Sequence, residues 1–164
     1  VMRSAMLKQN IIDAGVPDIH QVWCHETGGS RMLHGVSIKQ RYPGHSRQAG
    51  QIAAQCRAAA YASKYVIVTD EDVDVTKLDQ LIWAMMVRTD PKQSIDFISN
   101  AWDSPADPML TPKQREQGDM THSVAIIDAC RPFHWMDQFP MSNAPSPEVL
   151  KKAEEKFGYL MEGR

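Results

Sequence analysis

A short β-branched segment places the strongest constraint on how this chain folds. Residues 64–69 read Lys-Tyr-Val-Ile-Val-Thr and are almost uninterrupted in their apolar and β-branched character. A strand with one face in water alternates apolar and polar residues, whereas a parallel strand covered on both faces does not. The segment therefore predicts a central strand, buried on both faces, in a mostly parallel sheet.

Strand-like and helix-like segments alternate around this central strand. The β-like runs predict further strands at Ile19–Cys24, Leu33–Ile38, Ser94–Ser99 and Ser123–Ile127. Apolar residues at helical spacing predict helices at Met2–Ala14, at His45–Ala62, from a Thr76 cap to Asp90-Pro91, and from Ser146-Pro147 to the C-terminal region. The proline-containing segment 100–120 is expected to be a long, lid-like loop, and segment 132–147 is expected to be irregular.

This order of elements predicts the fold class. Strands that alternate with helices are typical of an α/β layered domain. Two early strands without a helix between them indicate that the sheet is mixed. We therefore expect an α/β (α+β) fold, a single layered domain over residues 1–164, with a mixed, largely parallel sheet flanked by helices and with a C-terminal helix.

Composition narrows the classes of partner. The 164 residues contain 43% hydrophobic residues, which suits one globular domain, and 18 Lys and Arg against 20 Asp and Glu give no basic excess for a nucleic-acid backbone. No apolar run reaches the ~20 residues that cross a bilayer. Three cysteines without a CxxC pair fit reduced thiols. We expect a cytoplasmic protein without membrane or nucleic-acid partners, and a start at Val1 leads us to expect a piece of a longer chain.

The acidic run Asp70-Glu71-Asp72-Val73-Asp74 follows the central strand, where open α/β sheets place ligands. An EF-hand is excluded because its required Gly and Glu positions hold Val75 and Leu81. Two alternatives stay open. Asp70 and Asp72 could share a divalent ion, as in a metal-dependent glycosyl or phosphoryl transferase, or the acids form a solvated turn before the next helix.

Other chemical motifs are weak. The six histidines lack HxxxH and HExxH spacing, and Gly28-Gly29-Ser30 lacks the pattern of a phosphate-binding loop. Cys130 and His134 form a loose nucleophile–base pair with no third group to orient it. Trp102 and Phe133 lie in irregular segments, where large aromatic side chains either anchor loops or line a pocket for a flat ligand.

The central segment resembles a family signature. Residues 64–75, followed by Leu-Ile-Trp-Ala-Met-Met-Val-Arg-Thr-Asp-Pro at 81–91, resemble the UbiD family of reversible aromatic-acid decarboxylases, which use prenylated flavin mononucleotide. The resemblance extends to residues 36–45 upstream and to Ile-Ile-Asp-Ala-Cys-Arg-Pro at 126–132 downstream. It covers nearly the whole chain.

The resemblance implies that the chain is the C-terminal domain of such an enzyme. The prenylated flavin, a divalent metal (Mn or Mg), potassium and the catalytic Glu-Arg-Glu network would then belong to a preceding N-terminal domain. No catalytic, cofactor-binding or metal-binding residue is expected within this chain, which alone should be inactive. The expected partners are that N-terminal domain, an aromatic or heteroaromatic carboxylic acid, and further copies in a homodimer or higher oligomer.

The resemblance also implies substrate-binding residues in two loops. Trp102 and Ser104 match the first loop, and Arg131 and Phe133 match the second. Arg131 replaces an apolar residue that is usual in the cinnamate-type branch, which favours a polar or heteroaromatic acid. A charged guanidinium in a pocket requires a hydrogen-bonding partner, which would be the substrate carboxylate, a ring substituent or a protein acid such as Asp103.

A structural role is the remaining alternative. The Ala-rich face of His45–Ala62 and the terminal helix could serve chiefly in dimerisation, with no side chain touching substrate.

Overall fold

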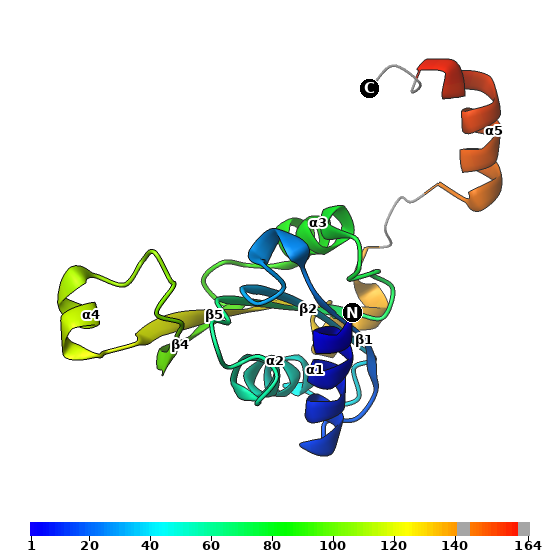
Figure 1. Ribbon diagram of the computed structural model, residues 1–164. Helices are drawn as coiled ribbons and strands as arrows, with labels where there is room; N and C mark the ends of the chain where they lie inside the picture. The colour runs from blue at the N-terminus through cyan, green and yellow to red at the C-terminus, as the bar shows by residue number, and fades with distance from the viewer. Residues whose placement is uncertain (141–144, 161–164) are drawn as a thin grey trace.

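A computed structural model describes residues 1–140 and 145–160, and its core is one five-stranded sheet in the order β1-β2-β3-β5-β4 (Figure 1). The strands are β1 (Ile19–Cys24), β2 (Leu33–Ile38), β3 (Tyr65–Asp70), β4 (Ile95–Trp102) and β5 (Thr121–Ala129). β2, β3 and β5 are parallel, while β1 and β4 pair with their neighbours antiparallel. The predicted fold class, a mixed α/β sheet with helices, is confirmed.

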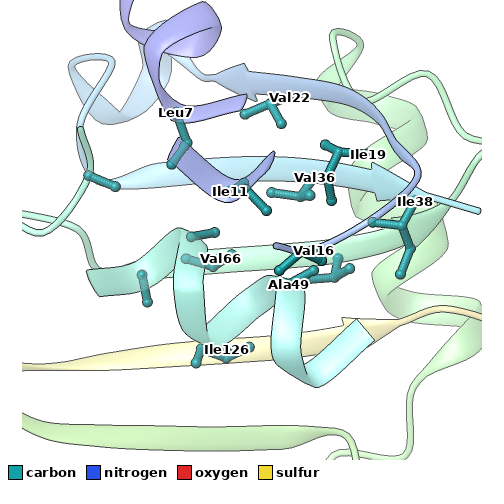
Figure 2. Close-up of a cluster of buried hydrophobic side chains, with 14 of the residues drawn as sticks. Leu7, Ile11, Val16, Ile19, Val22, Val36, Ile38, Ala49, Val66 and Ile126 are labelled. Atoms are coloured by element: carbon teal, nitrogen blue, oxygen red, sulfur yellow. The ribbon is translucent and has the colours of Figure 1, made fainter. Parts of the chain in front are cut away.

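β3 is the central strand, as its composition predicts, and its side chains alternate between two apolar clusters. Val66 and Val68 pack into the cluster that holds α1 (Met2–Asp13) and α2 (His45–Gln55), whereas Ile67 packs into the cluster that holds α3 (Leu78–Arg88). Figure 2 shows the larger cluster, in which side chains of α1 and α2 lie against β1, β2, β3 and β5. Full burial of one such aliphatic side chain contributes about 1.5–3 kcal/mol.

α2 lies close to the sheet because, after His45 in its first turn, its buried residues are all small. Ala49 and Ala53 are fully buried there. A Cβ added at Gly50 would lie 2.4 Å from Cγ2 of Ile126 and 3.2 Å from Cγ2 of Val68. The Ala-rich face thus packs within the chain, which contradicts the expectation that it serves chiefly in dimerisation.

Three expected boundaries are wrong. The helix predicted at His45–Ala62 ends at Gln55, because Cys56 has an extended backbone. Thr76 does not cap α3; Lys77 precedes the helix, and the Thr76 N–H and hydroxyl donate to Asp74 Oδ1. The segment expected to be one long loop holds the end of β4 and a short helix α4 (Pro112–Gln117), which a Thr111 capping box begins.

The C-terminal helix begins at the predicted residues, Ser146-Pro147, and it does not pack on the sheet. The segment after β5 contains two 3₁₀ turns, η2 (Phe133–Gln138) and, after α5, η3 (Gly158–Leu160), and part of the expected irregular stretch, 141–144, lies outside the described residues. Ser146 accepts a hydrogen bond from the Val149 N–H and begins α5 (Pro147–Phe157). α5 buries no side chain and lies apart from the sheet in Figure 1. Within the described residues, no helix has the length and apolar character to cross a membrane.

Candidate functional site

The carboxyl ends of the three parallel strands carry a cluster of polar side chains. Gln40 follows β2, Asp70 ends β3 and Arg131 follows β5. Asp70 is only 2% exposed. Its Oδ1 accepts from Gln40 Nε2 at 2.7 Å, and its Oδ2 accepts from the Arg131 backbone N–H at 2.7 Å and from Arg131 Nε at 3.0 Å. Asp70 therefore joins the ends of all three parallel strands.

Arg88, on the last turn of α3, binds the acidic turn from the helix side. Its Nη1 and Nη2 donate to the two carboxylate oxygens of Asp72 at 2.9 and 2.7 Å, and Nη1 lies 3.4 Å from Asp70 Oδ2. The hydrogen bond from Arg88 lowers the pKa of Asp72, with burial acting in the opposite direction. The expectation of a solvated turn is wrong for Asp70, because its side chain is buried and lies between the guanidinium groups of Arg88 and Arg131.

These contacts also bear on the two alternatives for the acidic run. A shared divalent ion would need free carboxylate oxygens on Asp70 and Asp72. In the structure those oxygens accept hydrogen bonds from Arg88, Arg131 and Gln40. The arrangement is an ion-paired turn, and it disfavours a transferase-type metal site.

A cavity of about 590 Å³ opens at this edge. Arg131 and Phe133, both expected from the sequence to face substrate, line it together. The Arg131 side chain is 30% exposed, so it lies at the cavity wall and not in the core. Other lining side chains include Gln40, Arg47, Arg88, His134, Trp135 and Phe139.

Trp102 and Ser104 lie at the opposite edge of the sheet. Trp102 pairs with Thr121, the first residue of β5, whereas Arg131 follows the last. A strand of nine residues spans roughly 25 Å. Trp102 is 63% exposed with its ring against Tyr61, and Ser104 Oγ accepts from the Tyr61 hydroxyl at 2.9 Å. Within this chain the structure does not bring the two expected pairs together.

Asp103 is not the partner of Arg131. Its side chain is buried at the same distant edge, where its Oδ2 lies 2.9 Å from Nδ1 of His122. Asp70 takes the role that was expected of Asp103. Cys130 is equally unsuited to its expected role, because burial raises the pKa of its thiol well above the usual value and keeps it protonated.

Sequence reasoning missed Gln40 and Arg88. Both had a signal: Gln40 follows a predicted strand, as Asp70 does, and Arg88 lies seven residues after Leu81 on the buried face of α3. An arginine on an apolar helix face needs a buried acid as partner. That requirement pointed to the acidic run.

Comparisons with known proteins identify the family of this chain. Residues 1–129 match a family model described as the 3-octaprenyl-4-hydroxybenzoate carboxy-lyase C-terminal domain of the UbiD type. The chain belongs to the UbiD family. A protein of Aeropyrum pernix, described only as uncharacterized, is 31% identical over 126 residues, which are 75% of this chain and 24% of that protein.

Solved UbiD-class structures share the fold. The apo 3,4-dihydroxybenzoic acid decarboxylase of Klebsiella pneumoniae is 26% identical with a TM-score of 0.76, over 94% of this chain and 32% of that one. The open form of vanillic acid decarboxylase from Sedimentibacter hydroxybenzoicus is 26% identical with a TM-score of 0.71, over 99% and 33%. The UbiD-class enzyme HmfF of Pelotomaculum thermopropionicum, in complex with FMN, has a TM-score of 0.77 at 22% identity, over 93% and 32%. This UbiD-family chain thus spans about a third of the length of these solved chains.

The described residues do not fit a flavin phosphate. A phosphate site needs free backbone N–H groups or unpaired cationic side chains. At the carboxyl edge, both Nη groups of Arg88 bind Asp72, Arg131 has the Asp70 carboxylate beside it and, among the described residues, only its two Nη groups free, and Gly28-Gly29 lies in a 3₁₀ turn between two strands. No reaction step through the flavin is therefore assigned to this chain.

Proposed function

We propose that this chain is the C-terminal domain of a UbiD-like reversible (de)carboxylase that acts on an aromatic or heteroaromatic carboxylic acid. The prenylated FMN, with a divalent metal (Mn or Mg) and potassium, would be held by an N-terminal domain of the same protein, and that flavin would supply the electron sink for cleavage of the carbon–carboxylate bond. This domain closes over the substrate, excludes water and fixes the orientation of the acid.

The observation that carries the proposal is the position of Arg131 beside the cavity. Its Nε is held by Asp70, and the described residues supply no hydrogen bond to its two Nη groups. Those groups form a planar fork that matches a carboxylate or another polar substituent of a bound acid. Phe133 lines the same cavity and offers an aromatic surface for the ring.

Trp102 and Ser104 are not part of the substrate site that we propose at the carboxyl edge. A single-ring acid cannot touch both ends of β5 at once, given a strand length of roughly 25 Å. Any contact of Trp102 or Ser104 with substrate would therefore need a pocket shared with another domain or another copy. The cavity at the carboxyl edge is assigned to Arg131 and Phe133 alone.

α5 supports a role in assembly. It buries no side chain, and Val149, Leu150 and Phe157 expose apolar surface along it. An amphipathic helix of this kind normally covers its apolar side with another surface. The proposal includes a homodimer or higher oligomer, with α5 as a contact element.

A substrate panel tests the proposed function. The full-length protein, loaded with prenylated FMN, is incubated with benzoic, hydroxybenzoic and heteroaromatic carboxylic acids, and exchange of the carboxyl carbon with labelled bicarbonate is followed. We expect exchange with at least one polar or heteroaromatic acid. Absence of exchange and of decarboxylation with every acid, in protein shown to hold the flavin, would contradict the proposal.

A further inference from the structure

The amino edge of the sheet holds a second cluster, which the proposed function does not use. Asp103 and Asp107 come from the turn after β4, and His122 lies on β5. Their side chains are 0%, 1% and 9% exposed. One ligand atom from each lies within 4.8 Å of the other two.

Each of these side chains uses one polar atom in a hydrogen bond to the backbone, and its second polar atom can bind a ligand. Asp103 Oδ1 accepts from the Ser104 N–H at 2.7 Å, and Asp107 Oδ1 accepts from the Met109 N–H at 2.9 Å. His122 Nε2 lies 2.7 Å from the carbonyl oxygen of Ser63, which can only accept, so Nε2 carries the proton. The neutral ring then presents the lone pair of Nδ1.

The atoms left over face one another without forming hydrogen bonds. Among the described residues, Asp103 Oδ2, Asp107 Oδ2 and His122 Nδ1 are buried and have no hydrogen-bond partner. Nδ1 lies 2.9 Å from Asp103 Oδ2, but the pair lacks the geometry of an N–H donor and its acceptor. Lone-pair atoms that converge in a buried space repel each other unless positive charge lies beside them. The only ammonium in contact among the described residues, Lys64 Nζ, pairs with Asp107 Oδ2 and leaves Asp103 Oδ2 and His122 Nδ1 without one.

We propose that Asp103, Asp107 and His122 bind a divalent transition-metal ion of the Mn²⁺ or Zn²⁺ class. Imidazole with carboxylates suits these ions, whereas Mg²⁺ and Ca²⁺ prefer oxygen ligands alone. With metal–ligand bonds of roughly 2.1 Å, adjacent ligands lie about 3.0 Å apart in an octahedral site and about 3.4 Å apart in a tetrahedral zinc site. The 2.9 Å between Nδ1 and Asp103 Oδ2 matches the octahedral spacing, which favours Mn²⁺, and a tetrahedral ion would need the two atoms to separate slightly. The Ser63 carbonyl fixes the tautomer of His122, as outer hydrogen bonds do for metal-binding histidines.

Lys64 is the group that competes with the metal. Its Nζ lies 2.5 Å from Asp107 Oδ2, and its side chain is 20% exposed. Lys64, Asp107 and His122 line a cavity of about 300 Å³, which provides a route to the cluster and space for the lysine to move aside.

The metal would fasten the turn after β4, which carries Asp103 and Asp107, to His122 on β5. Asp103 stands between Trp102 and Ser104, so a bound ion would fix the turn that carries both residues against β5. This site belongs to the present chain and is separate from the metal proposed for the N-terminal domain.

The test counts metal in the full-length protein. Wild type, His122→Gln and a control variant, His20→Gln, which changes an exposed histidine of β1, are stripped with a chelator and titrated separately with Mn²⁺ and Zn²⁺. We expect wild type and His20→Gln to bind one more equivalent than His122→Gln, and to show a rise in Tm with metal that His122→Gln lacks. Equal stoichiometry in all three proteins would overturn the site.

A second variant keeps the proposal testable if His122→Gln does not fold. Lys64→Gln removes the competing ammonium but no ligand, and we expect it to bind the added metal about tenfold more tightly than wild type, as loss of one charge-assisted contact implies. Unchanged or weaker binding in Lys64→Gln would contradict the proposal. Neither readout depends on decarboxylase activity, so the failure of one proposal is distinguishable from the failure of the other.

Discussion

At the scale of single residues, Arg131 is the most informative position for substrate choice. In the full-length enzyme, Arg131→Leu removes a charge-assisted hydrogen bond worth about 1.5–3 kcal/mol. We expect kcat/KM for the preferred acid to fall roughly ten- to a hundredfold, while cinnamate-like acids become relatively better substrates. The matched control is Arg41→Leu, since Arg41 pairs with Asp18 on the exposed surface. Equal kinetics and selectivity in both variants would show that Arg131 does not touch substrate.

Substitution of Asp70 and of Asp72 should lower the free energy of unfolding by different amounts. Asp70→Asn removes the buried carboxylate that pairs with Arg131 and lies beside Arg88, so we expect the free energy of unfolding to fall by about 3 kcal/mol. Asp72 is 43% exposed, and water screens its pair with Arg88, so Asp72→Asn should cost about 1 kcal/mol. Urea unfolding of the 164-residue chain measures both. Equal, small losses would contradict the buried role of Asp70.

His34 predicts a pH dependence of stability. It is fully buried in β2, and burial lowers its pKa to about 4. Between pH 6.5 and pH 4 the unfolded chain binds a proton that the folded chain does not, so stability falls as the pH falls, by about 3 kcal/mol at most. Urea unfolding at pH 7.5 and 4.5 should show a smaller difference for His34→Leu than for wild type. An unchanged difference would mean that His34 is not the group that titrates.

Residue-level sequence reasoning predicted that Arg131 lines a cavity, but it did not predict the side chains around it. Arg131 and Phe133 were expected beside one cavity, and the structure places them there. Asp103 was the wrong partner because β4 and β5 are antiparallel. The end of β4, which Asp103 follows, therefore lies beside the start of β5 and far from Arg131. Strand direction is a property of the sheet and not of the local sequence.

At the scale of elements, the close packing of α2 on the sheet gives a direct test. Gly50→Ala improves helix propensity by about 1 kcal/mol, but its Cβ would lie 2.4 Å from Cγ2 of Ile126, a fully packed side chain. Overpacking of this kind costs about 1–3 kcal/mol, so we expect net destabilisation in thermal unfolding. Gln51→Ala on the exposed side of α2 is the control and should be neutral or slightly stabilising. A more stable Gly50→Ala chain would show that α2 lies farther from β5.

Element types were largely predictable, and element ends were not. The β-branched, apolar sequence of β3 fits only a central strand that is buried on both faces. The start of α5 at Ser146-Pro147 follows from local capping chemistry. The alanines of residues 56–62 suit a helix equally well, but there the chain turns and Ala62 has a φ of +68°. Tertiary packing decides such ends, because Ala58 and Ala59 are buried in a non-helical conformation.

At the scale of the whole molecule, the described residues form a packed core and a cavity, but they do not form a flavin site. Two apolar clusters cover both faces of the sheet, so the domain has what it needs to pack as a unit. Its carboxyl edge carries a cavity without a flavin phosphate cradle, and solved relatives are about three times as long. Sequence comparison could identify the family from these 164 residues.

The most direct measurement compares the 164-residue chain with the full-length protein, each supplied with prenylated FMN and the best acid from the panel. Retained flavin is measured by absorbance after gel filtration, and decarboxylation by release of CO₂. We expect near-stoichiometric flavin and turnover for the full-length protein, and neither for the 164-residue chain, even when that chain is folded. Stoichiometric flavin retention or measurable turnover by the chain alone would contradict it.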